Sequence, residues 1–209
     1  MSKSVIDQLA VSLGHKDEVP NIELAHEIVA SGDKNAVKEL VENLGNKNKN
    51  IAFDCIKTLY EIGYKKPELI SGYAKEFINQ LKSKHGRMVW GAMTAISAIA
   101  GLVPETVYDN LSTIMDTADN SGSVIARDHT MYTLAALAKH SKYYEDCKAL
   151  MLEQLLKSPV NQLPMYAEIT GPVVSPIDKD AFKKVLEERL KDITQESKIK
   201  RIEKVLKKL

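Results

Sequence analysis

The sequence predicts an all-α protein in which helical hairpins stack on one another to form an α-α superhelix. Leu, Ala, Lys, Glu and Ile dominate its 209 residues, and all of these except Ile are strong helix formers. Only ten glycines and seven prolines are present, which is few for a β fold with many turns. Most importantly, three segments of the chain align without gaps at offsets of 37 and 38 residues, a spacing typical of helical repeats.

The repeated segment has a clear helical pattern. The three copies are IAFDCIKTLYEI (51–62), MVWGAMTAISAI (88–99) and ARDHTMYTLAAL (126–137). In each copy the first, fifth, eighth, ninth and twelfth positions are apolar or small. At about 100° per residue these positions fall on one narrow face of a helix. We therefore expect this face to be buried, with a neighbouring helix packed closely against the small residues.

Another amphipathic segment precedes each copy of the repeat. These segments cover 35–44, 67–83 and 104–118, and a further one covers 141–158. Pro67 and Pro104 stand where a proline suits the first helical turn, and Asp33 and Ser141 are candidate N-cap residues. The unit is therefore a helix A, a short turn and a helix B, and the chain is expected to contain about five such hairpins.

The hydrophobic frame of residues 34–175 resembles that of the HEAT repeat. The second helix of that repeat typically opens with Asp and Val-Arg and continues with spaced Ala and Leu. Here only Arg127 keeps the arginine, because Ala52 and Val89 occupy the same place in the other copies. The resemblance implies a HEAT/armadillo-like solenoid in which the B helices line the concave surface.

We expect one domain over residues 1–209 with distinct ends. Its expected parts are an N-terminal cap (1–33), core repeats (34–176) and a charged C-terminal capping hairpin (177–209). A polar terminal repeat keeps a solenoid soluble. Within the core, Pro164, Gly171 and Pro172 are expected to shorten or kink one helix B.

The charge balance gives no overall attraction to nucleic acid or membrane, since 29 basic residues face 28 acidic ones. The charge is uneven, however: Phe182 to Leu209 contains ten basic and five acidic residues. No apolar run approaches about 18 residues, and Asp7 and Gln8 interrupt the apolar patch near the start. We therefore expect a cytoplasmic protein that does not bind membranes.

The sequence predicts neither a metal site nor a cofactor. Cys55 and Cys147 lie far apart, outside any CxxC motif and without a histidine at metal-ligand spacing. Both are expected to be small core residues in a reducing compartment. The five histidines occur singly, and no phosphate-binding loop or nucleophile motif is present, so no catalytic residue is assigned and a non-enzymatic function is favoured.

The positions opposite the predicted buried face suggest a binding surface. The third, seventh and tenth positions of the three copies are Phe53, Lys57 and Tyr60; Trp90, Thr94 and Ser97; Asp128, Tyr132 and Ala135. With Tyr64, and with Tyr166 from the irregular repeat, the aromatic residues could form a stripe for a protein or peptide partner. A second interpretation stays open, in which Phe53 and Trp90 simply pack between adjacent B helices.

An enzymatic alternative comes from a second resemblance. Some alkylpurine DNA glycosylases are built on HEAT-like repeats and use concave Trp, Asp and Arg side chains, a set to which Trp90, Asp128 and Arg127 are similar. That resemblance implies DNA binding. The groove of that family is strongly basic, whereas this chain has nearly no net charge, which disfavours nucleic acid.

The basic tail also has two interpretations. Its cations are Lys198, Lys200, Arg201, Lys204, Lys207 and Lys208. They could engage phosphates or an acidic partner. Alternatively they form the solvated face of a capping helix, because apolar residues recur among them at helical spacing. A role of this last hairpin in assembly is a third possibility for the chain.

Overall fold

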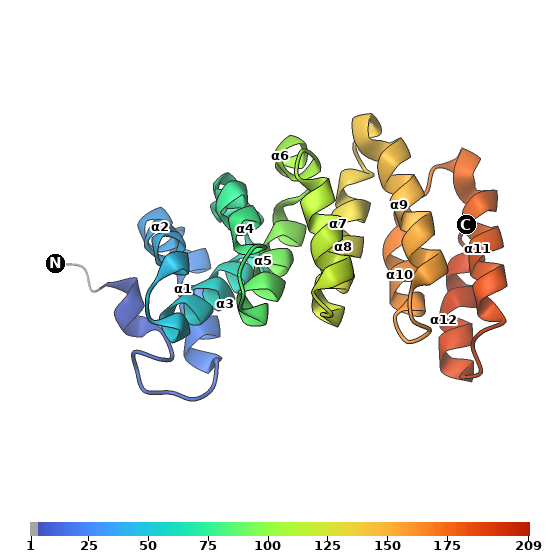
Figure 1. Ribbon diagram of the computed structural model, residues 1–209. Coiled ribbons are helices and arrows are strands. Elements are labelled where there is room, and N and C mark those ends of the chain that lie inside the picture. The colour runs from blue at the N-terminus through green and yellow to red at the C-terminus, as the bar shows by residue number, and fades with distance from the viewer. Residues whose placement is uncertain (1–3) are drawn as a thin grey trace. The chain divides into compact units, whose positions relative to one another are not determined.

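The computed structural model describes residues 4–209, and all regular secondary structure in that range is helical (Figure 1). The chain forms two compact units, Met1–His129 and Thr130–Leu209, and helix α8 (Val124–Leu137) passes from the first unit into the second. In the described part of the chain, no helix combines the length and the apolar character that crossing a membrane requires. The division of one domain into a cap, a core and a capping hairpin stays a prediction.

Two layers of helices make up the first unit. One layer contains α1 (Val19–Ser31), α3 (Lys49–Lys65) and α5 (Gly86–Ile99), in which α3 contacts both of the others. The second layer contains α2 (Lys34–Glu42), α4 (Ala74–Gln80), α6 (Pro104–Tyr108) and α7 (Leu111–Asn120). Helix α2 packs on α3 and α4 packs on α5, so each hairpin places one helix in each layer (Figure 1).

Local side-chain hydrogen bonds fix where several of these helices begin. The carboxylate of Asp33 accepts hydrogen bonds from the backbone N–H groups of Asn35 and Ala36, so the predicted N-cap of α2 is confirmed. Asn48 caps α3 in the same way through the N–H of Asn50. Ser141, by contrast, is the first residue of a 3₁₀ turn rather than an N-cap, so that expectation is wrong.

The predicted B helices are confirmed, but the A helices are not continuous. Segment 67–83 begins with two 3₁₀ turns (Pro67–Leu69 and Ser71–Tyr73) before α4. Segment 104–118 divides into α6 and α7, because the chain leaves helical geometry at Asn110. The side chain of Asn110 donates a hydrogen bond to the carbonyl of Thr106 at 2.9 Å, a local bond that competes with the regular helical pattern. Segment 141–158 likewise begins with a 3₁₀ turn before α9.

The predicted buried face of the B helices is confirmed at almost every position. In α5 the five residues Met88, Ala92, Ala95, Ile96 and Ile99 are all buried, as are the corresponding residues of α8. In α3, Ile51 is partly exposed and the other four positions are buried. The helical period of apolar residues therefore identified the core correctly.

Helices α3 and α5 approach each other closely at Gly91. A Cβ atom at this position would lie 2.9 Å from Cγ1 and 3.2 Å from Cγ2 of Ile56, which is itself buried. Glycine thus leaves the space that the Ile56 side chain fills. This contact brings the two helices together beside Trp90, the residue that precedes Gly91.

We predict that Gly91→Ala destabilises the protein by about 1 kcal/mol or more. Overpacking in a core typically costs about 1–3 kcal/mol, which outweighs the gain of up to about 1 kcal/mol from replacing glycine by alanine in a helix. Denaturant unfolding measures the effect. Gly86→Ala in the same helix is the control, because nothing lies within 4 Å of its new methyl group. Equal stability of the two variants would contradict the predicted close contact.

The second unit also has two layers. Its helices are α9 (Tyr144–Lys157), α10 (Leu163–Thr170), α11 (Lys179–Leu190) and α12 (Glu196–Leu206). Helix α9 contacts α10 and α11, and α12 contacts α10 and α11. The prediction that α10 is shortened is confirmed: Pro164 lies in its first turn, and a 3₁₀ turn from Gly171 to Val173 follows it. Pro172 cannot donate the backbone hydrogen bond that a longer helix would need.

Arg189 of α11 joins two helices of the second unit. Its guanidinium group donates hydrogen bonds to the carbonyls of Leu155 and Leu156, each at 2.6 Å, and to that of Ser158 at 2.8 Å. These carbonyls lie at the end of α9, where the helix itself supplies no donors. One planar cation therefore caps α9 and fixes its position against α11.

We predict that Arg189→Lys lowers the free energy of unfolding by about 1–3 kcal/mol. Lysine keeps the charge, but a single ammonium group cannot reach three carbonyls that the guanidinium bonds from two nitrogens. Thermal or denaturant unfolding followed by circular dichroism measures the loss. Lys191→Ala, at an exposed position two residues further along the chain, is the control. A stability equal to that of the native protein would show that the carbonyls are satisfied without Arg189.

Both cysteines are buried in the core, as the sequence predicts. Cys55 lies in α3 of the first unit and Cys147 in α9 of the second. Burial raises the pKa of each thiol to about 12, and neighbouring carboxylates add to the effect. The thiolate is the reactive form of cysteine, so both side chains are chemically inert in the folded protein.

Candidate functional site

A layer of aromatic rings lies on α3 and α5, away from the buried face of these helices. The ring centroids of Tyr60 and Trp90 are 5.9 Å apart, and those of Tyr60 and Tyr64 are 5.8 Å apart. Phe53 contacts His85, the residue before α5, edge to face at 5.8 Å. These separations fall in the favourable range for aromatic pairs, about 4.5–7 Å. Neighbouring B helices therefore hold the rings in fixed positions.

Glu18 connects two cations to this layer. Its carboxylate lies 3.2 Å from Lys57 Nζ and also forms an ion pair with Arg87. Lys57 pairs with Glu61 at 2.8 Å as well, and its ammonium group lies 4.8 Å from the centroid of the Tyr60 ring. The guanidinium of Arg87 lies 5.6 Å from the centroid of Phe53. Each cation is thus held between a carboxylate and an aromatic ring, an arrangement that cation–π attraction favours.

The pKa values show how firmly these charges are paired. Partial burial alone would raise the pKa of Glu18, but hydrogen bonds from Arg87 and Lys57 outweigh burial and lower this pKa. Burial would lower the pKa of Lys57, but hydrogen bonds to Glu61 and Tyr60 outweigh it and raise the pKa. Both groups therefore stay charged at neutral pH. Phe53, Tyr60, Tyr64, Trp90, Lys57 and Arg87, with Glu18 and Glu61, are called the aromatic face below.

The predicted positions on this face differ in their exposure. Phe53, Lys57 and Trp90 are partly exposed, so a partner can reach them. Tyr60 is only 5% exposed and Thr94 only 2%, which corrects the expectation that both project to solvent. Tyr60 is covered by its neighbours on α3 and α5, and the hydroxyl of Thr94 bonds to the carbonyl of Trp90 at 2.9 Å. The same face thus contains both buried side chains, such as Tyr60, and partly exposed ones, such as Trp90.

The remaining predicted residues lie outside this cluster. Arg127 and Asp128 are partly exposed near the start of α8, and the Nε of Arg127 is buried without a hydrogen-bond partner in the described chain. Tyr132 is 44% exposed, so its role in binding stays a prediction. Tyr166 is 1% exposed in the core of the second unit, so the expectation that it lines a groove is wrong. Pro164, in the first turn of α10, is also buried.

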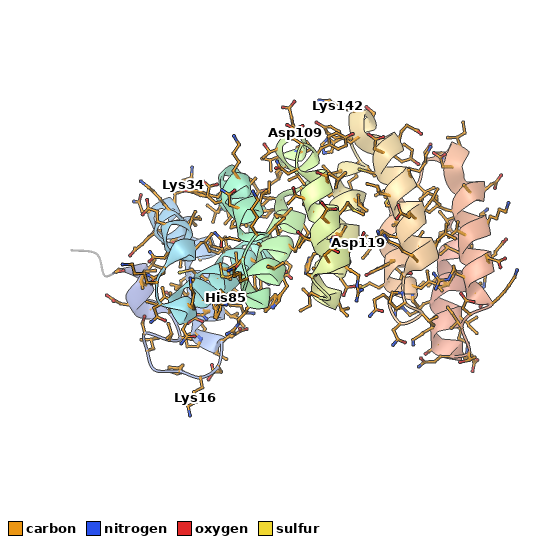
Figure 2. All side chains as sticks on the ribbon, in the orientation of Figure 1. Lys16, Lys34, His85, Asp109, Asp119 and Lys142 are labelled. Atoms are coloured by element: carbon orange, nitrogen blue, oxygen red, sulfur yellow. The ribbon has the colours of Figure 1, made fainter. Side chains whose placement is uncertain are left out.

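A cavity of about 500 Å³ adjoins the aromatic face at Trp90. The turn between α4 and α5 bounds it on one side, and α7 bounds it on the other. Its lining residues on α7 are Thr113, Asp116, Thr117 and Asn120. His85, which Figure 2 labels, stands at the end of that turn where α5 begins. One side of Trp90 therefore packs near Tyr60, and another borders open space.

Sequence reasoning missed a serine–histidine contact in the first unit. Ser97 Oγ lies 2.7 Å from His129 Nδ1 and 2.8 Å from the carbonyl oxygen of Thr94. The tautomer of His129 decides which of the two groups donates in the serine–histidine contact, so this contact by itself assigns no catalytic role to either residue.

We predict that His129 makes stability depend on pH. Burial lowers its pKa from 6.5 to about 4, so between these values the unfolded chain binds a proton that the folded chain excludes. The free energy of unfolding should therefore fall by about 1–3 kcal/mol as the pH drops through this window. His129→Gln should weaken this dependence of stability on pH. The control is His26→Gln, because His26 is an exposed residue of α1. Identical pH profiles for the native protein and His129→Gln would refute the prediction.

Comparison with solved structures identifies the fold. A designed armadillo repeat protein, YIII(Dq)4CqI, superposes with a TM-score of 0.67 and 16% identity over 98% of each chain. A second design of this kind, solved in complex with the peptide (KR)4, gives a TM-score of 0.68 and 15% identity over 89% of this chain and 85% of that one. A computationally designed armadillo repeat protein for modular peptide recognition gives 0.65 and 15% over 90% and 86%.

These similarities confirm the predicted fold class. The chain has the armadillo-like helical repeat fold, and five hairpins follow α1 in the described residues. At such low identity the likeness concerns the fold alone. No protein-family model and no curated protein matches the sequence.

Proposed function

We propose that this protein is a non-enzymatic scaffold that binds a peptide or protein segment on the aromatic face. The observation that carries the proposal is the fixed row of partly exposed rings and cations on α3 and α5. Phe53 and Trp90 each offer accessible ring surface, while contacts with His85 and Tyr60 hold their orientation. Rigid aromatic side chains lose little conformational freedom on binding, which is why they dominate binding energy at interfaces.

The charges of the aromatic face support a particular kind of partner. Lys57 and Arg87 are balanced by Glu18 and Glu61, so the face has no net charge. Binding there would rest on stacking and apolar contact rather than on long-range attraction. We therefore expect an extended segment that places apolar, aromatic or arginine side chains against Phe53 and Trp90.

The same pairing disfavours the DNA glycosylase alternative. A DNA-binding face needs cations that are free to neutralise phosphates. Lys57 and Arg87 already form ion pairs, and Glu18 and Glu61 would repel a phosphate backbone. Similar folds support the peptide proposal, since two of the designed proteins above are described with a peptide or for peptide recognition.

We predict that a peptide selected on the purified protein binds at the aromatic face. Peptides enriched from a displayed random library would be synthesised and titrated while the emission of Trp90, the single tryptophan, is recorded. The emission should shift on binding, because Trp90 is part of the face. Phe53→Ala should weaken binding about tenfold or more, as loss of an interface aromatic commonly does.

Leu102→Ala is the matched control, since it removes an exposed apolar side chain beyond the far end of α5. It should leave the affinity within about twofold. Raising the salt concentration from about 0.05 to about 0.5 M should also have little effect, because the face is neutral. Equal weakening by both variants, or a peptide that binds without changing Trp90 emission, would count against this site.

A further inference from the structure

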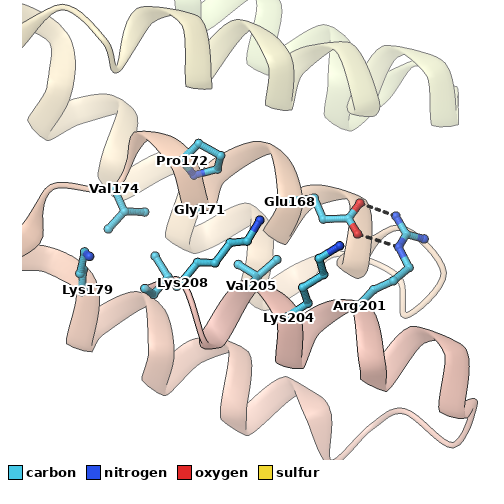
Figure 3. A pocket seen from close by; sticks show the side chains of 10 residues that line it. Glu168, Gly171, Pro172, Val174, Lys179, Arg201, Lys204, Val205 and Lys208 are labelled. Carbon is cyan, nitrogen blue, oxygen red and sulfur yellow. Dashed lines mark hydrogen bonds and ion pairs between the residues drawn. The ribbon is translucent and has the colours of Figure 1, made fainter.

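The second unit contains a positively charged cavity that the proposed function does not use. It has a volume of about 550 Å³ and lies between the end of α10 and helix α12 (Figure 3). The residues that line it are Glu168, Gly171, Pro172, Val174, Lys179, Arg201, Lys204, Val205, Lys208 and Leu209. A volume of this order is typical of ligand pockets, about 300–1,000 Å³.

Some basic residues of α12 and of the turn after it form ion pairs, and others do not. Arg201 bonds Glu168 through two nitrogens at 2.8 and 2.6 Å, and Lys200 pairs with Glu196 at 2.6 Å. Lys204 and Lys208 form no ion pair with any residue that the structure describes, and the same holds for Lys179. These three cations line the cavity together with the Arg201–Glu168 pair, so its lining has a net positive charge.

The cavity also has an apolar wall. Pro172 and Val174 follow α10, and Val205 lies on α12 between Lys204 and Lys208 in the sequence. A Cβ atom at Gly171 would lie 2.9 Å from Cγ1 of Val205, so the end of α10 approaches α12 closely here. In Figure 3 the side chain of Lys208 extends across the cleft toward the end of α10, and that of Lys204 extends toward Glu168. The anionic groups of a ligand could therefore contact the lysines, while its apolar groups contact the apolar wall.

The spacing of the cations favours an extended ligand over a compact one. Lys204 lies in the last turn of α12, and Lys208 lies in the turn that follows it, where the N–H of Leu209 bonds to the carbonyl of Val205 at 3.1 Å. A near-helical rise over these four residues separates the two backbones by about 6 Å along the axis. In an extended peptide, side chains on the same side recur about every 6.6–6.8 Å. Acidic residues at alternate positions would thus match the two lysines, while the residues between them would face the wall formed by Pro172 and Val174.

We propose that this cavity in the second unit binds an extended acidic peptide with carboxylates at alternate positions and apolar residues between them. Glu168 sets one limit of the site. The hydrogen bonds from Arg201 lower its pKa, so it remains an anion and repels a ligand that is negatively charged along its whole length. A continuous phosphate backbone would meet that carboxylate and the apolar wall, whereas an alternating peptide avoids both conflicts.

A fluorescein-labelled peptide of four Glu-Val repeats tests the proposal with the full-length protein. Fluorescence anisotropy should show saturable binding that weakens about tenfold or more when salt rises from about 0.05 to about 0.5 M. A peptide of four Lys-Val repeats should not bind. The double variant Lys204→Ala, Lys208→Ala should weaken binding of the Glu-Val peptide about tenfold.

The double variant Lys200→Ala, Lys207→Ala is the matched control, because it removes the same charge from exposed positions in and directly after α12 that lie outside the cavity. It should change the affinity less than about threefold. Alanine favours helix formation, so circular dichroism should show both variants folded. Equal weakening by the two variants, absence of saturable binding, or tighter binding of a single-stranded oligonucleotide or inorganic phosphate would each overturn the proposal.

The result of the Glu-Val peptide test does not depend on whether the aromatic face binds a peptide. The substituted lysines lie in a different unit from Phe53 and Trp90. The probe is an acidic peptide, whereas the aromatic face has no net charge to attract it. The aromatic face should bind its selected peptide with unchanged affinity in the Lys204→Ala, Lys208→Ala variant. Loss of both interactions together in that variant would overturn the assignment of two separate sites.

Discussion

The close contact between α3 and α5 determines what the first unit can present to a partner. Gly91 lets Ile56 fill the space between the two helices, and the residue before it is Trp90. Because the helices meet there, the Trp90 ring reaches Tyr60, and Arg87 reaches Glu18 together with Lys57. A larger side chain at position 91 would separate the helices and disturb rings and ion pairs alike. The packing of α3 on α5, to which the close approach of Gly63 and Ala98 also contributes, thus positions the candidate binding face.

Sequence periodicity predicted the B helices because their pattern is local and repeated. The breaks in the A helices were missed, since they depend on individual bonds such as that from the Asn110 side chain to Thr106. The aromatic positions were predicted correctly, but the burial of Tyr60 was not predicted. Tyr60 is buried because α5 covers it in the folded chain, and the sequence pattern of α3 alone does not show this. Glu18 had no signal at all. It is 69 residues from Arg87, and no periodic pattern connects a loop residue to a distant helix.

The two candidate surfaces show how one repeat architecture produces different chemistry. On the aromatic face every cation is held by a carboxylate, so we expect shape and stacking to determine what binds there. In the cavity beside α12, three lysines form no ion pair with a described residue, so we expect charge to contribute directly. The backbone arrangement is similar, with B helices side by side in both units. The two surfaces therefore differ in their outward side chains, while the buried frame is similar in both units.

The buried thiols have a practical consequence for following the two units separately. Each unit contains one cysteine, and neither can react with an alkylating reagent until its surroundings open. The rate at which Cys55 is modified therefore reports transient opening of the first unit, and the rate at Cys147 reports opening of the second. Mass spectrometry can distinguish the two modified peptides in one experiment. The native chain thus contains one thiol probe of local opening in each unit, and no cysteine has to be engineered.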